Sequence, residues 1–420
     1  MLAKRLMGSL VGLAAAALVS LGVNAAEPVK IGLIEPFSGP IAAVGRDTLE
    51  GFELLAEMIN ESGGVLDGRE VEIVPLDNAM NAEKTIQQLK KAIDMGLRYV
   101  SQGVGSNHAL NIIKFLKKHN KRNPDKAILY LNHSAVTTAF TNELCSYWHF
   151  RFDANVDMKV AALATQIGRD TSIKKVYMIN QNYAYGKSFQ SAAQRLLKER
   201  APAVEMVGDE LIVPFGKVLD FTPYVAKVKD SGADTVLTGN WGPDLVRFVK
   251  AAASSGLGVQ FYTIYGGLPG SIAGIGKDDG TAVVFKQLTE IHENMDLPPD
   301  LAAFAEEYRK RYDKSVYSDR IRWMMLMFAA AIDKAGTDDP SSVAAALEGI
   351  TFAGPGGEVL MRPDDHQIQM PMVISTMTDQ VEKTVLYDGV DLGVGWKTDG
   401  WTSREEAEQP TSCSMDRPAT

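Results

Sequence analysis

Residues 30–40 read KIGLIEPFSGP. The opening KIGLI predicts a buried β-strand, and the residues that follow it predict a turn. A helix is expected over residues 48–62, and Gly63 and Gly64 stand where a helix C-cap is expected. Its apolar side chains fall on one stripe: Leu49, Phe52, Leu55, Ala56 and Ile59. A buried strand followed by an amphipathic helix is the repeating unit of a parallel sheet that helices cover on both faces.

The same alternation continues in two series. Strands are expected over residues 71–76, 99–102 and 127–131, then over 175–179, 206–213, 235–238 and 260–264. Helices are expected over residues 82–95, 109–119, 156–169, 187–200, 222–231 and 243–255. Residues 300–335 hold two more helices and 341–347 a third, before short, partly antiparallel strands at 359–361, 368–376 and 383–386. Because the chain is too long for one core, the pattern predicts an α/β fold with two doubly wound parallel-sheet lobes.

Residues 1–26 are predicted to be a cleaved secretory signal peptide. Lys4 and Arg5 precede an apolar run from Leu10 to Leu21, and small residues then favour cleavage near Ala25 or Ala26. A membrane anchor is the alternative, but the run is shorter than the roughly 20 residues that a bilayer span needs. No cysteine follows the run, so we expect no lipid anchor. The expected compartment is the periplasm.

Two cysteines, Cys145 and Cys413, are present in the whole chain. In an oxidising compartment, an isolated pair is more often a structural disulfide than a metal or redox site. We therefore predict a bond that fastens the C-terminal tail to the first lobe. Two free thiols are the alternative.

The composition and motifs favour no nucleic-acid partner, cofactor or catalytic centre. The net charge of −9 carries no basic pattern suited to nucleic acid or anionic lipid. The sequence has no GxSxG elbow, no GxxxxGK[ST] phosphate loop and no GxGxxG after its first strand. Its six histidines show no metal-ligand spacing. We therefore expect no enzyme, no cofactor and no metal site.

Polar and aromatic residues gather in the loops that follow the predicted strands. Ligands of open α/β sheets bind beyond the carboxyl ends of the strands, so these loops are the candidate site. Those of the first lobe offer hydroxyls, amides and helix-start N–H groups suited to a carboxylate: Ser106, Asn107, Ser134 and Ala135. Those of the second lobe offer mainly rings suited to an apolar or aromatic body: Tyr183, Tyr185, Asn240, Trp241 and Tyr265.

The chain resembles the type I periplasmic binding proteins of the branched-chain amino-acid importer group, the leucine/isoleucine/valine-binding-like proteins. The resemblance covers about residues 28–390 and rests on a set of motifs that are weak one by one. They are the opening strand with the SGP turn at 38–40, INESGGV at 59–65, VEIVPLD at 71–77, Tyr185-Gly186 after a strand, ADTV at 233–236 and PGG at 355–357.

The resemblance implies two lobes that are joined by crossing segments and close over one ligand. Residues 27–150 with about 288–350 would form lobe I, and residues 151–287 with about 351–395 would form lobe II. Residues 396–420 would be a tail that returns to lobe I.

The family's ligand contacts can be carried over to this chain. Its carboxylate contacts map to Ser106 and to Ser134-Ala135, its capping ring to Tyr185, and a further contact to Asn240 or Trp241.

Two positions depart from the family pattern. Tyr265 stands where amino-acid binders of the group carry an acid for the ligand ammonium, and Val44 stands where they usually carry an aromatic residue. A buried ammonium without a charge partner is costly, so the sequence favours a carboxylate or amide with an apolar or aromatic body over an ordinary amino acid.

The expected function is that of a monomeric solute receptor that hands its ligand to an ABC permease in the inner membrane. Two alternatives are a sensor of the same fold that acts on a partner regulator and a secreted hydrolase.

Overall fold

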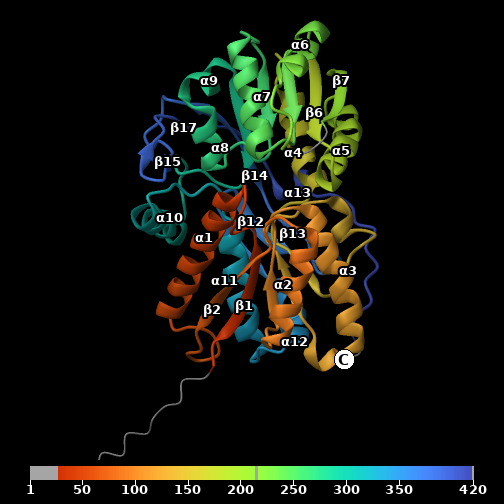
Figure 1. Ribbon diagram of the computed structural model, residues 1–420, viewed down its shortest axis with the longest axis vertical. Coiled ribbons are helices and arrows are strands. Elements are labelled where there is room, and N and C mark those ends of the chain that lie inside the picture. Colours follow the sequence, from red (N-terminus) through yellow and green to blue (C-terminus); the bar gives the residue numbers. More distant parts are fainter. Residues whose placement is uncertain (1–26, 213–215, 419–420) are drawn as a thin grey trace, which may run out of the picture.

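The computed structural model describes residues 27–212 and 216–418 of the chain. The predicted signal peptide lies outside these residues. Two α/β lobes lie one above the other and are joined by several crossings of the chain (Figure 1). No helix in the described part has both the length and the apolar character that a membrane span needs.

Lobe I is built on a parallel sheet in the order β2-β1-β3-β4-β5. Its strands are β1 (Val29–Glu35), β2 (Val71–Asp77), β3 (Tyr99–Ser101), β4 (Leu129–Asn132) and β5 (His149–Arg151). Its helices are α1 (Ala42–Glu61), α2 (Ala82–Asp94), α3 (Ser106–Arg122), α11 (Arg320–Ala335) and α12 (Pro340–Leu347). The strand order reverses between β1 and β3, which opens a crevice at the carboxyl ends of these strands.

Lobe II is built on a larger sheet in the order β17-β14-β10-β9-β8-β6-β7. The strands β6 (Lys175–Gln181), β7 (Glu205–Ile212), β8 (Thr235–Thr238), β9 (Gln260–Thr263) and β10 (Val284–Thr289) run parallel. The strands β14 (Met372–Thr378) and β17 (Gly395–Thr402) add an antiparallel edge. The helices are α4 (Val156–Arg169), α5 (Ala184–Arg200), α6 (Thr222–Ser231), α7 (Gly242–Ser254), α8 (Pro269–Ile275) and α9 (Lys277–Ala282). The strand order reverses between β6 and β8, so this lobe also has a crevice.

The predicted α/β fold of two lobes is confirmed. Helix α1 begins at Ala42, earlier than the sequence predicted. Gly45 permits this start, because a Cβ there would lie 2.2 Å from the carbonyl oxygen of Pro36. At the other end, the backbone N–H of Gly64 bonds to the carbonyl oxygen of Ile59 over 2.9 Å, so the predicted C-cap is confirmed.

Two segments near the C-terminus lie elsewhere than expected. Residues 396–402 belong to β17 at the edge of the lobe II sheet and not to a tail, because their backbone pairs with β14. The following α13 (Arg404–Ala407) packs on α4. The residues after α13 run along lobe I, where Cys413 is bonded to Cys145 as predicted.

The second segment holds β11 (Thr351–Gly354), β12 (Gly357–Met361) and β13 (Ile368–Gln369), which form a small antiparallel sheet. We predicted these residues in lobe II, but they lie against lobe I. The loop between β12 and β13 joins this small sheet to β5, because the N–H of Arg151 bonds to the carbonyl oxygen of His366 over 2.9 Å. The ring of His366 also stacks on Phe150. The expected strand at 383–386 is only β15 (Leu386–Tyr387), which pairs with β16 (Val390–Asp391). Helix α10 (Pro299–Tyr312) packs on α1.

Four buried charges lie where the lobes meet. Asp153 follows β5 in one crossing segment and Glu290 follows β10 in another, while Lys159 is on α4 of lobe II and Arg320 opens α11 of lobe I. The Lys159 Nζ lies 2.7 Å from Asp153 Oδ1 and 3.5 Å from Glu290 Oε1. The Arg320 Nη1 lies 3.9 Å from Asp153 Oδ2 and 4.0 Å from Glu290 Oε2. We call these residues the hinge charge cluster; its two cations balance its two carboxylates.

Replacing Lys159 by Met should destabilise the fold by about 3–5 kcal/mol, because the substitution leaves two buried carboxylates with one cation. Urea unfolding of the purified protein measures this. The matched control is Lys118→Met on the exposed face of α3, which should stay within about 0.5 kcal/mol of the native protein. Equal unfolding midpoints for the two variants would show that the cluster contributes no stability.

His292 lies in the crossing segment after β10, and its Nε2 is 2.8 Å from Thr398 Oγ1 on β17. Burial lowers the pKa of His292 from 6.5 to about 4. The unfolded chain therefore takes up this proton near pH 6.5, whereas the folded chain does so only near pH 4. The contribution of His292 to stability is complete above pH 6.5 and is lost as the pH falls toward 4.

The variant His292→Asn should lose less stability over this range, by up to about 1.4 kcal/mol per pH unit. Urea unfolding at pH 7.0, 5.5 and 4.5 tests it. An unchanged pH dependence in the variant would contradict the assigned role of His292.

Candidate functional site

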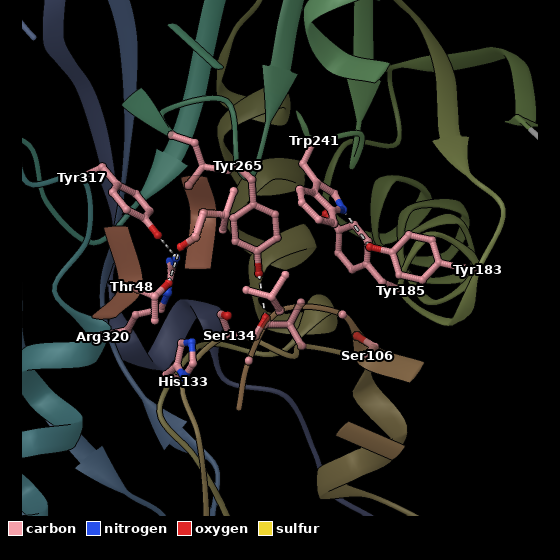
Figure 2. A pocket seen from close by; sticks show the side chains of 16 residues that line it. Thr48, Ser106, His133, Ser134, Tyr183, Tyr185, Trp241, Tyr265, Tyr317 and Arg320 are labelled. Carbon is pink, nitrogen blue, oxygen red and sulfur yellow. Dashed lines mark hydrogen bonds between the residues drawn. The ribbon is translucent and has the colours of Figure 1, made fainter. Parts of the chain in front are cut away.

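A cavity lies between the two lobes. It lies at the reversal points of both sheets, beyond the carboxyl ends of their strands. Side chains from both lobes line it (Figure 2). The lining residues are Val44, Thr48, Gly103, Val104, Gly105, Ser106, His133, Ser134, Val136, Tyr183, Tyr185, Trp241, Tyr265, Leu268, Tyr317 and Arg320.

The wall from lobe I is suited to an anion. Ser106 is the first residue of α3, and the N-cap residue Gly105 has φ 94° and no side chain to cap the helix. The N–H groups and the dipole at such a helix start favour negative charge. The hydroxyl-bearing Ser134 follows β4 on the same wall. A carboxylate placed here would meet hydroxyl and amide donors.

A buried carboxylate holds this wall in place. Glu35, at the end of β1, is fully buried and accepts a bond from the N–H of Gly103 over 2.6 Å. Its Oε1 also lies 3.2 Å from the Nε2 of His133. Gly103 has no room for a side chain, because a Cβ would come within 2.3 Å of the Ser134 hydroxyl oxygen. Glu35 therefore positions the loops after β3 and β4 against each other.

The wall from lobe II is aromatic. Tyr183 and Tyr185 follow β6, Trp241 follows β8 and Tyr265 follows β9. The Trp241 Nε1 donates to the Tyr183 hydroxyl over 2.8 Å, and the Tyr185 ring centroid lies 5.9 Å from that of Tyr265. Burial raises the pKa of Tyr183, Tyr185 and Tyr265, so all three stay neutral phenols. Rings at these distances form a continuous apolar surface.

Only a glycine fits at position 186, directly after Tyr185. A Cβ at Gly186 would lie 1.7 Å from the carbonyl oxygen of Gln181 at the end of β6. The first turn of α5 thus packs directly on the strand, which directs the Tyr185 ring into the cavity.

The cavity has no acidic side chain among its lining residues, and Arg320 is the one lysine or arginine among them. The Tyr265 hydroxyl lies 3.2 Å from the buried Asp153 Oδ2, and Asp153 itself is not part of the lining. In the described part of the chain, no group of three or more His, Cys, Asp or Glu residues could hold a metal ion. The arrangement suits the binding of an anion with an apolar body.

The structure brings six of the predicted ligand contacts together in the lining: Ser106, Ser134, Tyr183, Tyr185, Trp241 and Tyr265. The other three lie outside it. Asn107 is exposed on α3, Ala135 is buried with its N–H bonded to Asn132, and Asn240 is buried with its N–H bonded to Thr238.

Besides His133, which directly follows β4, three polar lining residues were not predicted: Thr48, Tyr317 and Arg320. None of them follows a strand, so a search of strand ends misses them. Thr48 points inward from α1, and Arg320 begins a helix whose other residues are largely apolar. An arginine at the start of such a helix was the signal available in the sequence.

The sequence over residues 28–382 matches the periplasmic binding protein family. The Leu/Ile/Val-binding protein homolog 4 of Brucella abortus is 32% identical over 97% of this chain and 98% of that protein. A leucine-, isoleucine-, valine-, threonine- and alanine-binding protein from Brucella ovis, solved in a closed conformation, matches with a TM-score of 0.83 and 31% identity over 94% of this chain and 100% of that one.

A solute-binding protein of an ABC transporter from R. palustris, solved with 4-hydroxybenzoate, has the same fold with a TM-score of 0.74. It is 21% identical over 90% of this chain and 97% of that one. The match to the family spans most of the chain, and the match to the Brucella protein spans nearly all of it. The chain therefore belongs to the periplasmic binding protein family, among the Leu/Ile/Val-binding-like solute-binding proteins of ABC transporters.

Proposed function

We propose that this protein is the periplasmic receptor of an ABC importer for a small carboxylate that has an apolar or aromatic body and no ammonium group. The absence of an acidic side chain among the lining residues carries this proposal. An ammonium in this cavity would lose its hydration without gaining a charge partner, which is costly. Solved relatives include amino-acid binders and aromatic-acid binders, and the acid-free lining favours the second kind of ligand.

The two walls have separate tasks in this proposal. The carboxylate binds Ser106, Ser134 and the start of α3, and the body lies against the rings of lobe II. Because the ligand contacts both lobes, it stabilises the closed state over the open one, and the closed form is what a permease can recognise. The ligand leaves unchanged, so the protein is not an enzyme.

The proposed function requires export of the protein to the periplasm. Cleavage near Ala25 or Ala26 would release a monomer into the periplasm, where it meets the permease in the inner membrane. The acidic balance of the chain gives it no affinity for nucleic acid.

Matched ligand pairs test the proposal. The mature protein should bind 4-methylpentanoate more than tenfold tighter than leucine, and 3-phenylpropanoate more than tenfold tighter than phenylalanine, because only the amino acids bury an unpartnered ammonium. Isothermal titration calorimetry gives the Kd of each, and mass spectrometry of the recovered ligand checks for turnover. Tighter binding of the amino acids would refute the ammonium-free ligand class, and a chemically altered ligand would refute the receptor.

Ser106 and its neighbour provide a matched pair of variants. Ser106→Ala should weaken binding of the tightest carboxylate about tenfold, which corresponds to the loss of one hydrogen bond to a charged group. Asn107→Ala should leave the Kd unchanged, because Asn107 is exposed on the same helix turn. If the two variants behave alike, the carboxylate does not bind at the start of α3.

A further inference from the structure

Three polar residues at one end of the cavity take no part in the proposed binding of the carboxylate and the apolar body. Thr48, Tyr317 and Arg320 gather at the end away from Ser106 (Figure 2). Thr48 comes from α1, Tyr317 from the connection before α11, and Arg320 from the first turn of α11. The carboxylate wall and this group therefore face the two ends of a bound ligand.

Arg320 is buried without using all its donors. Only 5% of the residue is exposed, and its Nη2 donates to the Tyr317 hydroxyl over 2.9 Å. Its Nε has no hydrogen-bond partner among the described residues, and its Nη1 is too far from Asp153 and Glu290 to bond. A buried guanidinium with unused N–H groups on the wall of a cavity is a binding position for an oxygen that the ligand supplies.

The neighbours of Arg320 define the kind of oxygen. The Tyr317 hydroxyl accepts from Arg320, so its own proton is free to be donated. The Thr48 Oγ1 spends its proton on the carbonyl oxygen of Val44 over 2.8 Å, so it can accept. A hydroxyl group can accept from Arg320 and Tyr317 and donate to Thr48. A carbonyl oxygen would leave Thr48 without a proton to accept.

Charge balance excludes a second carboxylate as the best ligand for this end. The positive charge of Arg320 is already offset within the hinge charge cluster, which holds two cations and two carboxylates. A further buried anion beside it would have no counter-charge. A neutral hydroxyl group adds no charge at this end of the cavity.

We infer that Thr48, Tyr317 and Arg320 select a hydroxyl group at the end of the ligand opposite its carboxylate, so that the substrate class is a hydroxylated, and in particular phenolic, carboxylic acid. This inference rests on the proposed function and names its substrate class. Arg320 is the specificity-determining residue, because it alone supplies a charged donor to that hydroxyl.

The test compares ligands that differ only in the hydroxyl. The Kd of 4-hydroxybenzoate is measured against that of benzoate, and the Kd of 3-(4-hydroxyphenyl)propanoate against that of 3-phenylpropanoate. The native protein should bind the hydroxylated member of at least one pair more than tenfold tighter. It should bind terephthalate, which carries a second carboxylate, more weakly than 4-hydroxybenzoate.

Variants of the protein test which residue causes the preference for the hydroxylated ligand. Arg320→Lys keeps the charge and loses the planar fork of donors, so the preference for the hydroxylated member should fall to twofold or less. The matched control is Arg247→Lys; Arg247 bonds to the carbonyl oxygen of Val218 outside the cavity, and the preference should persist. If Arg320→Lys fails to fold, Tyr317→Phe is measured instead. Its preference for the hydroxylated member should be at least threefold smaller than that of the native protein.

The outcomes separate the inference from the proposed function. The inference is overturned if the native protein binds both members of each pair equally, if the preference survives in Arg320→Lys, or if terephthalate binds more tightly than 4-hydroxybenzoate. The receptor proposal stands in each of these cases. If no ammonium-free acid binds while leucine does, the proposed ligand class fails and the inference fails with it.

Discussion

Four charges are buried where the lobes meet, and they are stable there only while they neutralise one another. Asp153 and Glu290 stand on two crossing segments, Lys159 on lobe II and Arg320 on lobe I. Desolvation of an isolated charge would be prohibitive, so each residue must keep its partners. This constraint ties the crossing segments to both lobes and holds Arg320 in place on the wall of the cavity.

The ring of Tyr265 is held by the same charges. Lys159 Nζ lies 5.5 Å and Arg320 Cζ 5.7 Å from its centroid, within the range of cation–π attraction, and its hydroxyl faces Asp153. The resemblance predicts an acid at this position in amino-acid binders. Here the carboxylate of Asp153 lies behind the ring and not in the cavity. The cluster thus keeps negative charge away from the ligand while it orients the ring that covers it.

Much of the fold could be predicted from periodicity, because a strand buried on both faces and an amphipathic helix leave clear local patterns. The edge strand β17 was missed because most of its side chains are exposed or half-buried, so its sequence GWKTDGWT lacks an apolar alternation. The small sheet β11–β13 was assigned to the wrong lobe because its contacts with β5 are long-range in sequence. The walls built from strand ends were predictable, whereas Glu35 and Arg320 act through partners that only the folded chain brings near.

The position of Arg320 links stability to specificity. As a member of the cluster, its charge is already offset, so it does not attract a second anion to the cavity. As a lining residue, it keeps unused N–H donors at the end away from Ser106. A neutral acceptor satisfies these donors without disturbing the charges that hold the crossing segments, whereas an anion would compete with Asp153 and Glu290 for the same guanidinium. The balance that stabilises the hinge therefore also restricts what the cavity can hold.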